Sequence, residues 1–319
     1  MLSKYIHYFS KLRRDSKNGG APHKPILLLS IIELVQKGEI INNRIEITPE
    51  LVLKFKNNWS KLVTTNHHAN FALPFFHMKS EPFWKLVTKT GMILPISSSN
   101  SVKSFNSLKE SIAFAEIDNE LFLFMVDPIS SAVIKENLLE KYFSETKNEL
   151  QNKSYDLFNI IENQLVADSA VEYRSRIEEL KNTLSKESFE EEVFVRSGVF
   201  KREVPKVYDY HCAISGMRIE STTNAQLVDA CHIIPFSFSQ DDTIPNGISL
   251  SPNLHRAFDR GLIAINDNYQ LIISTAMKEN DSPYSIKQFV GKQLLLPSLE
   301  KFYPSLENLN WHYKNTFIQ

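Results

Sequence analysis

One segment of the 319-residue chain, from Asp229 to Asp259, places one histidine in a predicted strand and another in a predicted helix. The first is His232, in the run D-A-C-H-I-I-P-F-S, and the second is His255, in S-P-N-L-H-R-A-F-D-R-G. A neutral imidazole can accept a proton near neutral pH, and an imidazole with carboxylates beside it can hold a divalent metal. These groups are the inventory for metal-assisted cleavage of a phosphodiester bond.

The predicted local structure brings these groups together. Residues 227–234 read as a strand, Asn246 lies in the loop that follows, and residues 251–259 begin a helix with a Ser-Pro start. His255 and Asp259 are four residues apart in that helix, so their side chains lie on one face. That geometry suits a pair of metal ligands.

This strand, loop and helix resemble the HNH endonucleases, a ββα-metal nuclease family, over about residues 195–275. Within that family the resemblance is to the HNH domains of McrA-like, modification-dependent (type IV) restriction enzymes. It implies a catalytic triplet of His232, Asn246 and His255. His232 would be the general base that activates a water, and Asn246 would tie the loop to the strand and orient His232 by a hydrogen bond.

The resemblance also implies a metal bound by Asp229, His255 and Asp259, which would polarise the phosphate and stabilise the leaving 3′ oxygen. Family members often carry a metal-binding side chain immediately before the base, where this chain has Cys231. The third ligand is therefore either Asp229 or Cys231. Mg²⁺ or Mn²⁺ is expected, while Co²⁺, Ni²⁺ and Zn²⁺ are also compatible with such ligands.

The charge of the chain is unevenly distributed, although its net value is only −1. Residues 1–90 hold 14 Lys and Arg against 6 Asp and Glu, whereas residues 91–200 hold 11 against 19. A basic N-terminal third is the electrostatic footprint expected for binding a polyanion, here double-stranded DNA.

The N-terminal third also contains the runs G-G-A-P-H-K-P-I-L-L-L (19–29), L-P-F-F-H-M (73–78) and P-F-W-K-L (82–86). They are similar to the sulfur-binding domain fused to HNH domains in phosphorothioate-dependent restriction enzymes. The resemblance implies a basic cluster on the DNA backbone and an apolar cup for sulfur, which is larger and more weakly hydrated than oxygen. The implied DNA-contacting residues are Arg13, Arg14, Lys17, His23, Lys24, Leu73, Pro74, Phe75, Phe76, His77 and Lys79.

Two positions depart from the pattern of that domain: Leu73 stands where an aromatic residue is commoner, and His77 where a smaller residue would fit better. Two alternatives therefore stay open. The aromatic residues could belong to the core, with His23 as a helix cap. The domain could also read methylated or hydroxymethylated cytosine, since a flipped base needs an aromatic pocket.

The predicted fold class is α+β: a mixed α/β DNA-reader domain (1–130), a helical connector (131–192) and a ββα-metal HNH domain (193–319). Residues 25–37 and 49–62 read as helices of the first domain. The aromatic run that starts at residue 71 is too bulky and rich in proline for a simple helix. The acidic connector favours a solvated helix over a dimerising coiled coil.

Several classes of protein are excluded by composition. No apolar run approaches the roughly 18 residues that a membrane span needs, and the N-terminus lacks the apolar core of a signal peptide. The two cysteines, Cys212 and Cys231, can form neither a disulfide framework nor the four-cysteine zinc clamp of many HNH proteins. A cytoplasmic location is expected.

The sequence thus predicts an endonuclease that cuts modified foreign DNA, acting as a homodimer because one HNH site cuts one strand. Two alternatives remain. One is an HNH nuclease that ignores modification, and the other is a DNA-binding regulator with an inert HNH fold.

Overall fold

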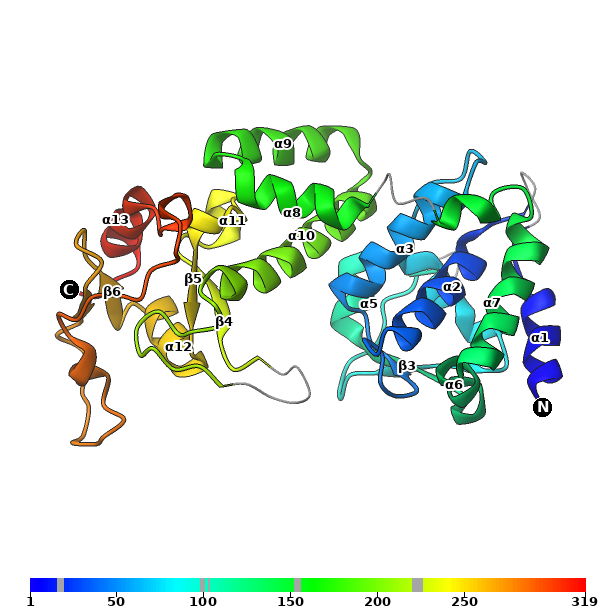
Figure 1. The fold of residues 1–319 in the computed structure, drawn as a ribbon, viewed down its shortest axis with the longest axis horizontal. Helices are drawn as coiled ribbons and strands as arrows, with labels where there is room; N and C mark the ends of the chain where they lie inside the picture. The colour runs from blue at the N-terminus through cyan, green and yellow to red at the C-terminus, as the bar shows by residue number, and fades with distance from the viewer. Residues whose placement is uncertain (16–19, 98–100, 103, 152–155, 220–225) are drawn as a thin grey trace. The chain divides into compact units, whose positions relative to one another are not determined.

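The computed structural model (Figure 1) describes residues 1–15, 20–97, 101–102, 104–151, 156–219 and 226–319. The expected DNA contact Lys17 lies outside the described residues. The chain forms two compact units: unit 1 comprises residues 1–158 and 183–195, and unit 2 comprises residues 159–182 and 196–319. The mixed helices and strands of the two units confirm the α+β class.

The units differ in extent from the three predicted segments. Much of the predicted connector belongs to unit 1, because its first helix, α7 (Pro128–Phe143), packs against α1 (Leu2–Ser10) and α2 (His23–Gln36). The part of the predicted connector that follows forms α8 (Leu157–Ala167) and α9 (Ala170–Thr183), most of which belongs to unit 2.

The core of unit 1 is built around α2, which is buried along almost its whole length. Figure 1 shows α2 between α3 (Pro49–Leu62) and α7, and both helices contact it. Helix α3 has the predicted bounds, because Thr48 accepts a hydrogen bond from the Leu51 amide and Pro49 occupies its first turn. The remaining helical elements of unit 1 are α4 (Ala72–His77), η2 (Met78–Ser80), α5 (Phe105–Ser111), α6 (Asn119–Val126) and η3 (Lys147–Gln151).

A three-stranded antiparallel sheet completes unit 1, in the order β1 (Arg44–Ile45), β3 (Ile112–Ile117), β2 (Trp84–Thr88). Residue Ala115 of the central strand pairs with Ile45 on one side and Leu86 on the other. Ala115 itself is fully buried, so the centre of this small sheet belongs to the core.

Unit 2 is organised around a two-stranded antiparallel ladder of β4 (Asp229–His232) and β5 (Gly247–Leu250), followed at once by α12 (Pro252–Asp259). A hairpin of β6 (Ile263–Ile265) and β7 (Leu271–Ile273) comes next. The remaining elements are α11 (Phe236–Ser239), η4 (Ile244–Asn246), η5 (Ile286–Phe289), η6 (Glu300–Phe302) and α13 (Leu306–Asn315), together with α10 (Lys186–Val207), which joins unit 2 from Arg196 onward.

Helix α13 packs against α12 through His312 and Phe258. The buried His312 ring stacks on Phe258 of α12, with ring centroids 3.6 Å apart, and its Nε2 lies 3.0 Å from the Phe258 carbonyl oxygen. Burial lowers the pKa of His312, so the ring is neutral and packs as an apolar group. Among the described residues, no helix combines the length and the apolar character needed to cross a membrane.

Candidate active site

The strand–strand–helix unit fixes the predicted catalytic residues in one place. Antiparallel pairing sets His232, the last residue of β4, opposite Gly247, the first residue of β5. Ser251 has extended backbone angles and Pro252 occupies the first helical position, so α12 begins as soon as β5 ends. The close succession of ladder and helix brings the side chains of β4 and α12 together.

His232 is held on two sides. Its Nε2 lies 2.8 Å from Oδ1 of Asp242, a fully buried carboxylate, and its ring stacks on Phe200 of α10 with centroids 3.9 Å apart and planes 8° apart. The Asp242 carboxylate accepts a hydrogen bond from the Nε2–H group of His232, so the lone pair of the ring is on Nδ1. The described residues offer Nδ1 no hydrogen-bond partner, which leaves it available as a base.

Gly247 is required for this stacking. A Cβ atom at this position would lie 2.5 Å from Cγ2 of Val204 and 2.9 Å from Cζ of Phe200. Both residues belong to α10, so the glycine lets the start of β5 approach that helix closely. The φ of Gly247 is −125°, a value that any residue can adopt. The glycine of the Asn-Gly pair is therefore needed for its lack of a side chain and not for its backbone conformation.

Asn246 closes the loop between the two strands. Its side-chain amide donates to the backbone oxygens of Ile234 (3.0 Å) and Asp241 (2.9 Å), and its Oδ1 accepts from the Ile234 amide (3.0 Å). The tie between loop and strand is thus present. The hydrogen bond of the His232 ring differs from the expectation, because its partner is the Asp242 carboxylate and not the Asn246 side chain.

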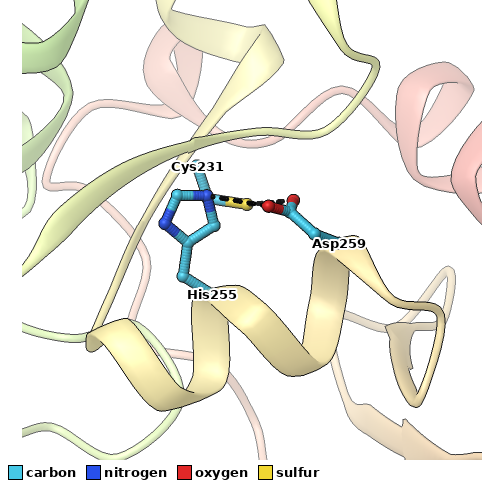
Figure 2. Close-up of side chains that lie close together, drawn as sticks. All are labelled: Cys231, His255 and Asp259. Atoms are coloured by element: carbon cyan, nitrogen blue, oxygen red, sulfur yellow. Dashed lines mark hydrogen bonds and ion pairs between the residues drawn. The ribbon is translucent and has the colours of Figure 1, made fainter. Parts of the chain in front are cut away.

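Three potential metal ligands gather beside the ladder (Figure 2): Cys231, His255 and Asp259, whose donor atoms all lie within 4.8 Å of one another. Nε2 of His255 is 3.4 Å from one oxygen of Asp259, and Sγ of Cys231 is 3.8 Å from the other. Burial, and then the Asp259 carboxylate, raise the pKa of the Cys231 thiol well above its ordinary value. The group can hold a divalent cation between a strand and a helix.

Asp229 takes a different place from the other candidate ligands. Its Oδ2 lies 3.2 Å from Nδ1 of His255, the ring nitrogen that faces away from Asp259. A carboxylate on the second nitrogen is the arrangement that orients metal-binding histidines in proteins and directs the Nε2 lone pair toward the metal. In this structure Cys231 joins the donor group, and Asp229 supports it.

Asp242, Tyr173 and Phe200 are functional candidates that the sequence did not indicate. Asp242 stands in the D-D-T-I-P-N-G run, where its acidity was visible but its partner was not. Tyr173 of α9 donates from its hydroxyl to Oδ2 of Asp242 at 3.4 Å, and Phe200 belongs to α10. Both lie far before the ladder in the chain, and no local pattern connects them to it.

Unit 1 contains a separate pocket of about 460 Å³. It collects most of the residues predicted to contact DNA, and its lining consists of Arg13, Arg14, Asp15, Ala21, His23, Lys24, His67, Leu73, Pro74, His77 and Ser80. We call it the unit 1 pocket. Lys79 lies outside the lining, with its ammonium 3.7 Å from the ring centre of Phe76.

Only the first part of the aromatic run, residues 72–77, forms a helix, α4, where none was predicted; the rest forms η2, a turn and the start of β2. Pro74 is tolerated because it lies in the first turn, where the missing N–H has no helical partner. Leu73, Pro74 and His77 line the pocket, whereas Phe75 and Phe76 are buried in the core. The structure therefore corrects the placement of Phe75 and Phe76 in the pocket wall.

The charges of the unit 1 pocket come from fewer residues than expected. The ammonium of Lys24 is buried and lies 2.5 Å from Oε1 of Glu81, so it is already paired. Burial lowers the pKa of both His23 and His77, which leaves their rings neutral near pH 7. Arg13 and Arg14 are therefore the cations of the pocket that can meet a phosphate.

Residues 212–266 match the model of the HNH_2 family, described as HNH endonuclease. The chain thus carries an HNH endonuclease domain, and β4, β5 and α12 all lie within the matched residues.

Among solved structures, the chain is similar to a modification-dependent TagI restriction endonuclease, with 18% identity, coverage of 36% of each chain and a TM-score of 0.27. It is also similar to the type IV phosphorothioation-dependent restriction endonuclease ScoMcrA, with 10% identity, coverage of 79% of this chain and 94% of that chain, and a TM-score of 0.34. The chain thus spans about a third of the TagI enzyme. No curated protein matches the sequence.

Proposed function

We propose that the protein is a divalent-metal-dependent endonuclease that cuts double-stranded DNA carrying a modified backbone. One observation carries the nuclease part. A base candidate, His232, is held by a buried carboxylate and follows directly after Cys231, a member of the donor group formed with His255 and Asp259.

The proposed reaction is hydrolysis by in-line attack. Nδ1 of His232 takes a proton from a water whose oxygen attacks phosphorus, and the bond between phosphorus and the 3′ oxygen breaks. Asp242 stabilises the imidazolium that forms. Asp229 keeps His255 in the orientation in which Nε2 faces Asp259. When bound, a divalent metal polarises the phosphate and neutralises the charge on the leaving oxygen.

The modification-reading part of the proposal rests on the unit 1 pocket. Its wall combines the apolar Ala21, Leu73 and Pro74 with arginine side chains, which suits a phosphorothioate, an anion with one large and weakly hydrated atom. Among the described residues, no Phe, Tyr or Trp lines the pocket, and the rings that could stack on a flipped methylated base are the small imidazoles of His23, His67 and His77. We therefore favour a modified backbone over a modified base as the ligand.

Since the chain has one HNH site and each site cuts one strand, we propose that two copies act together on a duplex. This homodimer forms on DNA or before binding. Sedimentation of the protein with and without a cognate duplex separates these two cases.

The test is a cleavage assay with Mn²⁺ or Mg²⁺ on one duplex in three forms: unmodified, phosphorothioated and cytosine-methylated. We expect cutting of the phosphorothioated duplex alone. His232→Ala should reduce the rate by about 10²- to 10⁴-fold, because it removes the base, while leaving DNA affinity measured by fluorescence anisotropy nearly unchanged.

Each other outcome has a definite meaning. Equal cutting of all three duplexes would support an HNH nuclease without modification dependence. DNA binding without cutting in any metal would support a DNA-binding regulator with an inert HNH fold. Undiminished cutting by His232→Ala would remove His232 as the base.

A further inference from the structure

The two cysteines of the chain sit in different surroundings. The Cys212 thiol is buried and its only hydrogen-bonding neighbour among the described residues is the Ser251 hydroxyl, at 3.8 Å. The Cys231 thiol is equally buried; it lies 3.6 Å from the His232 carbonyl oxygen and 3.8 Å from Oδ1 of Asp259, and His255 completes the group (Figure 2). A cysteine that only fills core space does not need two ionisable partners.

The donor atoms around Cys231 have the spacing of a metal's ligands. A tetrahedral ion with a metal–sulfur distance of about 2.3 Å and metal–nitrogen and metal–oxygen distances of about 2.1 Å separates its ligands by about 3.4–3.6 Å. The separations here are 3.4 Å between His255 and Asp259 and 3.8 Å between Cys231 and Asp259. These two distances end on different oxygens of Asp259, and all the donor atoms lie within 4.8 Å of one another, so side-chain shifts of up to about an ångström would close the site on such an ion.

The neighbours of these residues prepare them for ligation. Asp229 holds Nδ1 of His255 at 3.2 Å, so the lone pair of Nε2 is directed at the group. Cys231 is fixed by the β4–β5 ladder, in which it pairs with Ile248, and Asp259 ends a helix that starts at Pro252. Three donors on a strand and a helix leave a fourth tetrahedral position for water or phosphate, as in catalytic metal sites.

We propose that Cys231 is a direct ligand of the metal and that the site binds thiophilic divalent cations such as Zn²⁺ and Co²⁺ more tightly than Mg²⁺. The inference rests on the proposed function and names the class of metal that serves it. Thiolate is a soft donor that selects such ions, whereas Mg²⁺ prefers oxygen ligands. On binding, the sulfur–hydrogen bond is replaced by a sulfur–metal bond and the proton passes to solvent.

The test is titration of the full chain with Co²⁺, followed by absorption spectroscopy. We expect a sulfur-to-cobalt charge-transfer band that saturates at one Co²⁺ per chain. The band should disappear in Cys231→Ser and Cys231→Ala and persist in the matched control Cys212→Ser. Calorimetry should show Co²⁺ affinity falling at least about 10- to 100-fold in Cys231→Ala, since losing a ligand costs no less than losing a supporting residue.

A band that persists in Cys231→Ala, or calorimetric Co²⁺ binding without any band in the wild type, would overturn the proposal. So would tighter binding of Mg²⁺ than of Zn²⁺ and Co²⁺. Circular dichroism of each variant identifies any that fails to fold, and the Ser and Ala variants serve as substitutes for each other. The absorption band is measured independently of cleavage. A band without DNA cutting would support Cys231 as a ligand and contradict the proposed nuclease function. Mg²⁺-supported cutting without a band would support the nuclease function and contradict Cys231 as a ligand.

Discussion

At the scale of single residues, the proposed base, His232, is held by a buried carboxylate. Asp242 uses one oxygen for His232 at 2.8 Å and the other for the Tyr173 hydroxyl at 3.4 Å. Burial, and then Asp242, raise the pKa of Tyr173 far above its ordinary value, so its hydroxyl remains a donor. The guanidinium of Arg196 lies 5.6 Å from the centre of the Tyr173 ring and completes the network.

Replacing Asp242 by Asn should slow cleavage without weakening DNA binding. An amide cannot stabilise the imidazolium that forms during proton transfer, so we expect kcat to fall by about 10²- to 10⁴-fold with KM nearly constant. Steady-state kinetics on the cognate duplex measure both constants. Asp241→Asn is the matched control, because Asp241 is also buried but bonds the Thr243 amide. An equal loss of kcat in both variants would mean that Asp242 has only a structural role.

At the scale of elements, α4 shows how one short helix serves two purposes. Its six residues present Leu73, Pro74 and His77 to the unit 1 pocket and bury Phe75 and Phe76. The sequence placed all five in the pocket, because a run of aromatic residues around a proline does not reveal which side faces solvent. The helical period of α4 determines which of these side chains face the pocket and which face the core, and the sequence did not predict that helix.

The two faces of α4 should respond differently to truncation. Phe75→Ala should lower the free energy of unfolding by about 3–5 kcal/mol, because it leaves a cavity in the core. Leu73→Ala, at a position 37% exposed, should change it by about 0.5 kcal/mol or less while reducing the preference for phosphorothioated over unmodified duplex. Urea denaturation and competition binding measure these effects. A Phe75→Ala variant that stays stable but loses the preference for phosphorothioated duplex would show that Phe75 contributes to the unit 1 pocket.

The elements of the nuclease domain were largely predictable, since strand, Ser-Pro helix start and four-residue spacing are all local signals. The sequence could not decide between Asp229 and Cys231, because both lie on the same face of β4 and both reach α12. The choice depends on the rotation of the His255 side chain, which turns Nδ1 toward Asp229 and Nε2 toward Asp259, the residue that Cys231 also contacts. The partners Tyr173 and Phe200 come from α9 and α10 and required the tertiary structure.

At the scale of the whole molecule, the excess of positive charge in residues 1–90 is divided between structure and binding. Lys24 and Glu81 form a buried pair, whereas Arg13 is exposed at the unit 1 pocket. Charge counted along a sequence therefore overstates the number of cations available to DNA. Only cations that remain exposed contribute to the salt dependence of binding.

Two substitutions separate these roles. Arg13→Ala should weaken DNA binding and reduce the slope of log affinity against log salt concentration by about 1, with folding intact. Lys24→Ala should instead lower the free energy of unfolding by about 3–5 kcal/mol, because it strands the buried Glu81 carboxylate. Anisotropy titrations over a salt series and thermal melts measure the two effects. An unchanged slope in Arg13→Ala would place the DNA-binding surface elsewhere.

The close approach at Gly247 has a consequence for mutational tolerance. A side chain of any kind at this position would meet Val204 and push Phe200 out of its stack with His232. Residue 247 has no side chain that could take part in the reaction, yet we expect it to tolerate no more substitution than His232, the proposed base. In a library of random variants selected for cleavage, we expect position 247 to be as invariant as position 232. The invariance of position 247 would then reflect a packing constraint and not a role in the reaction.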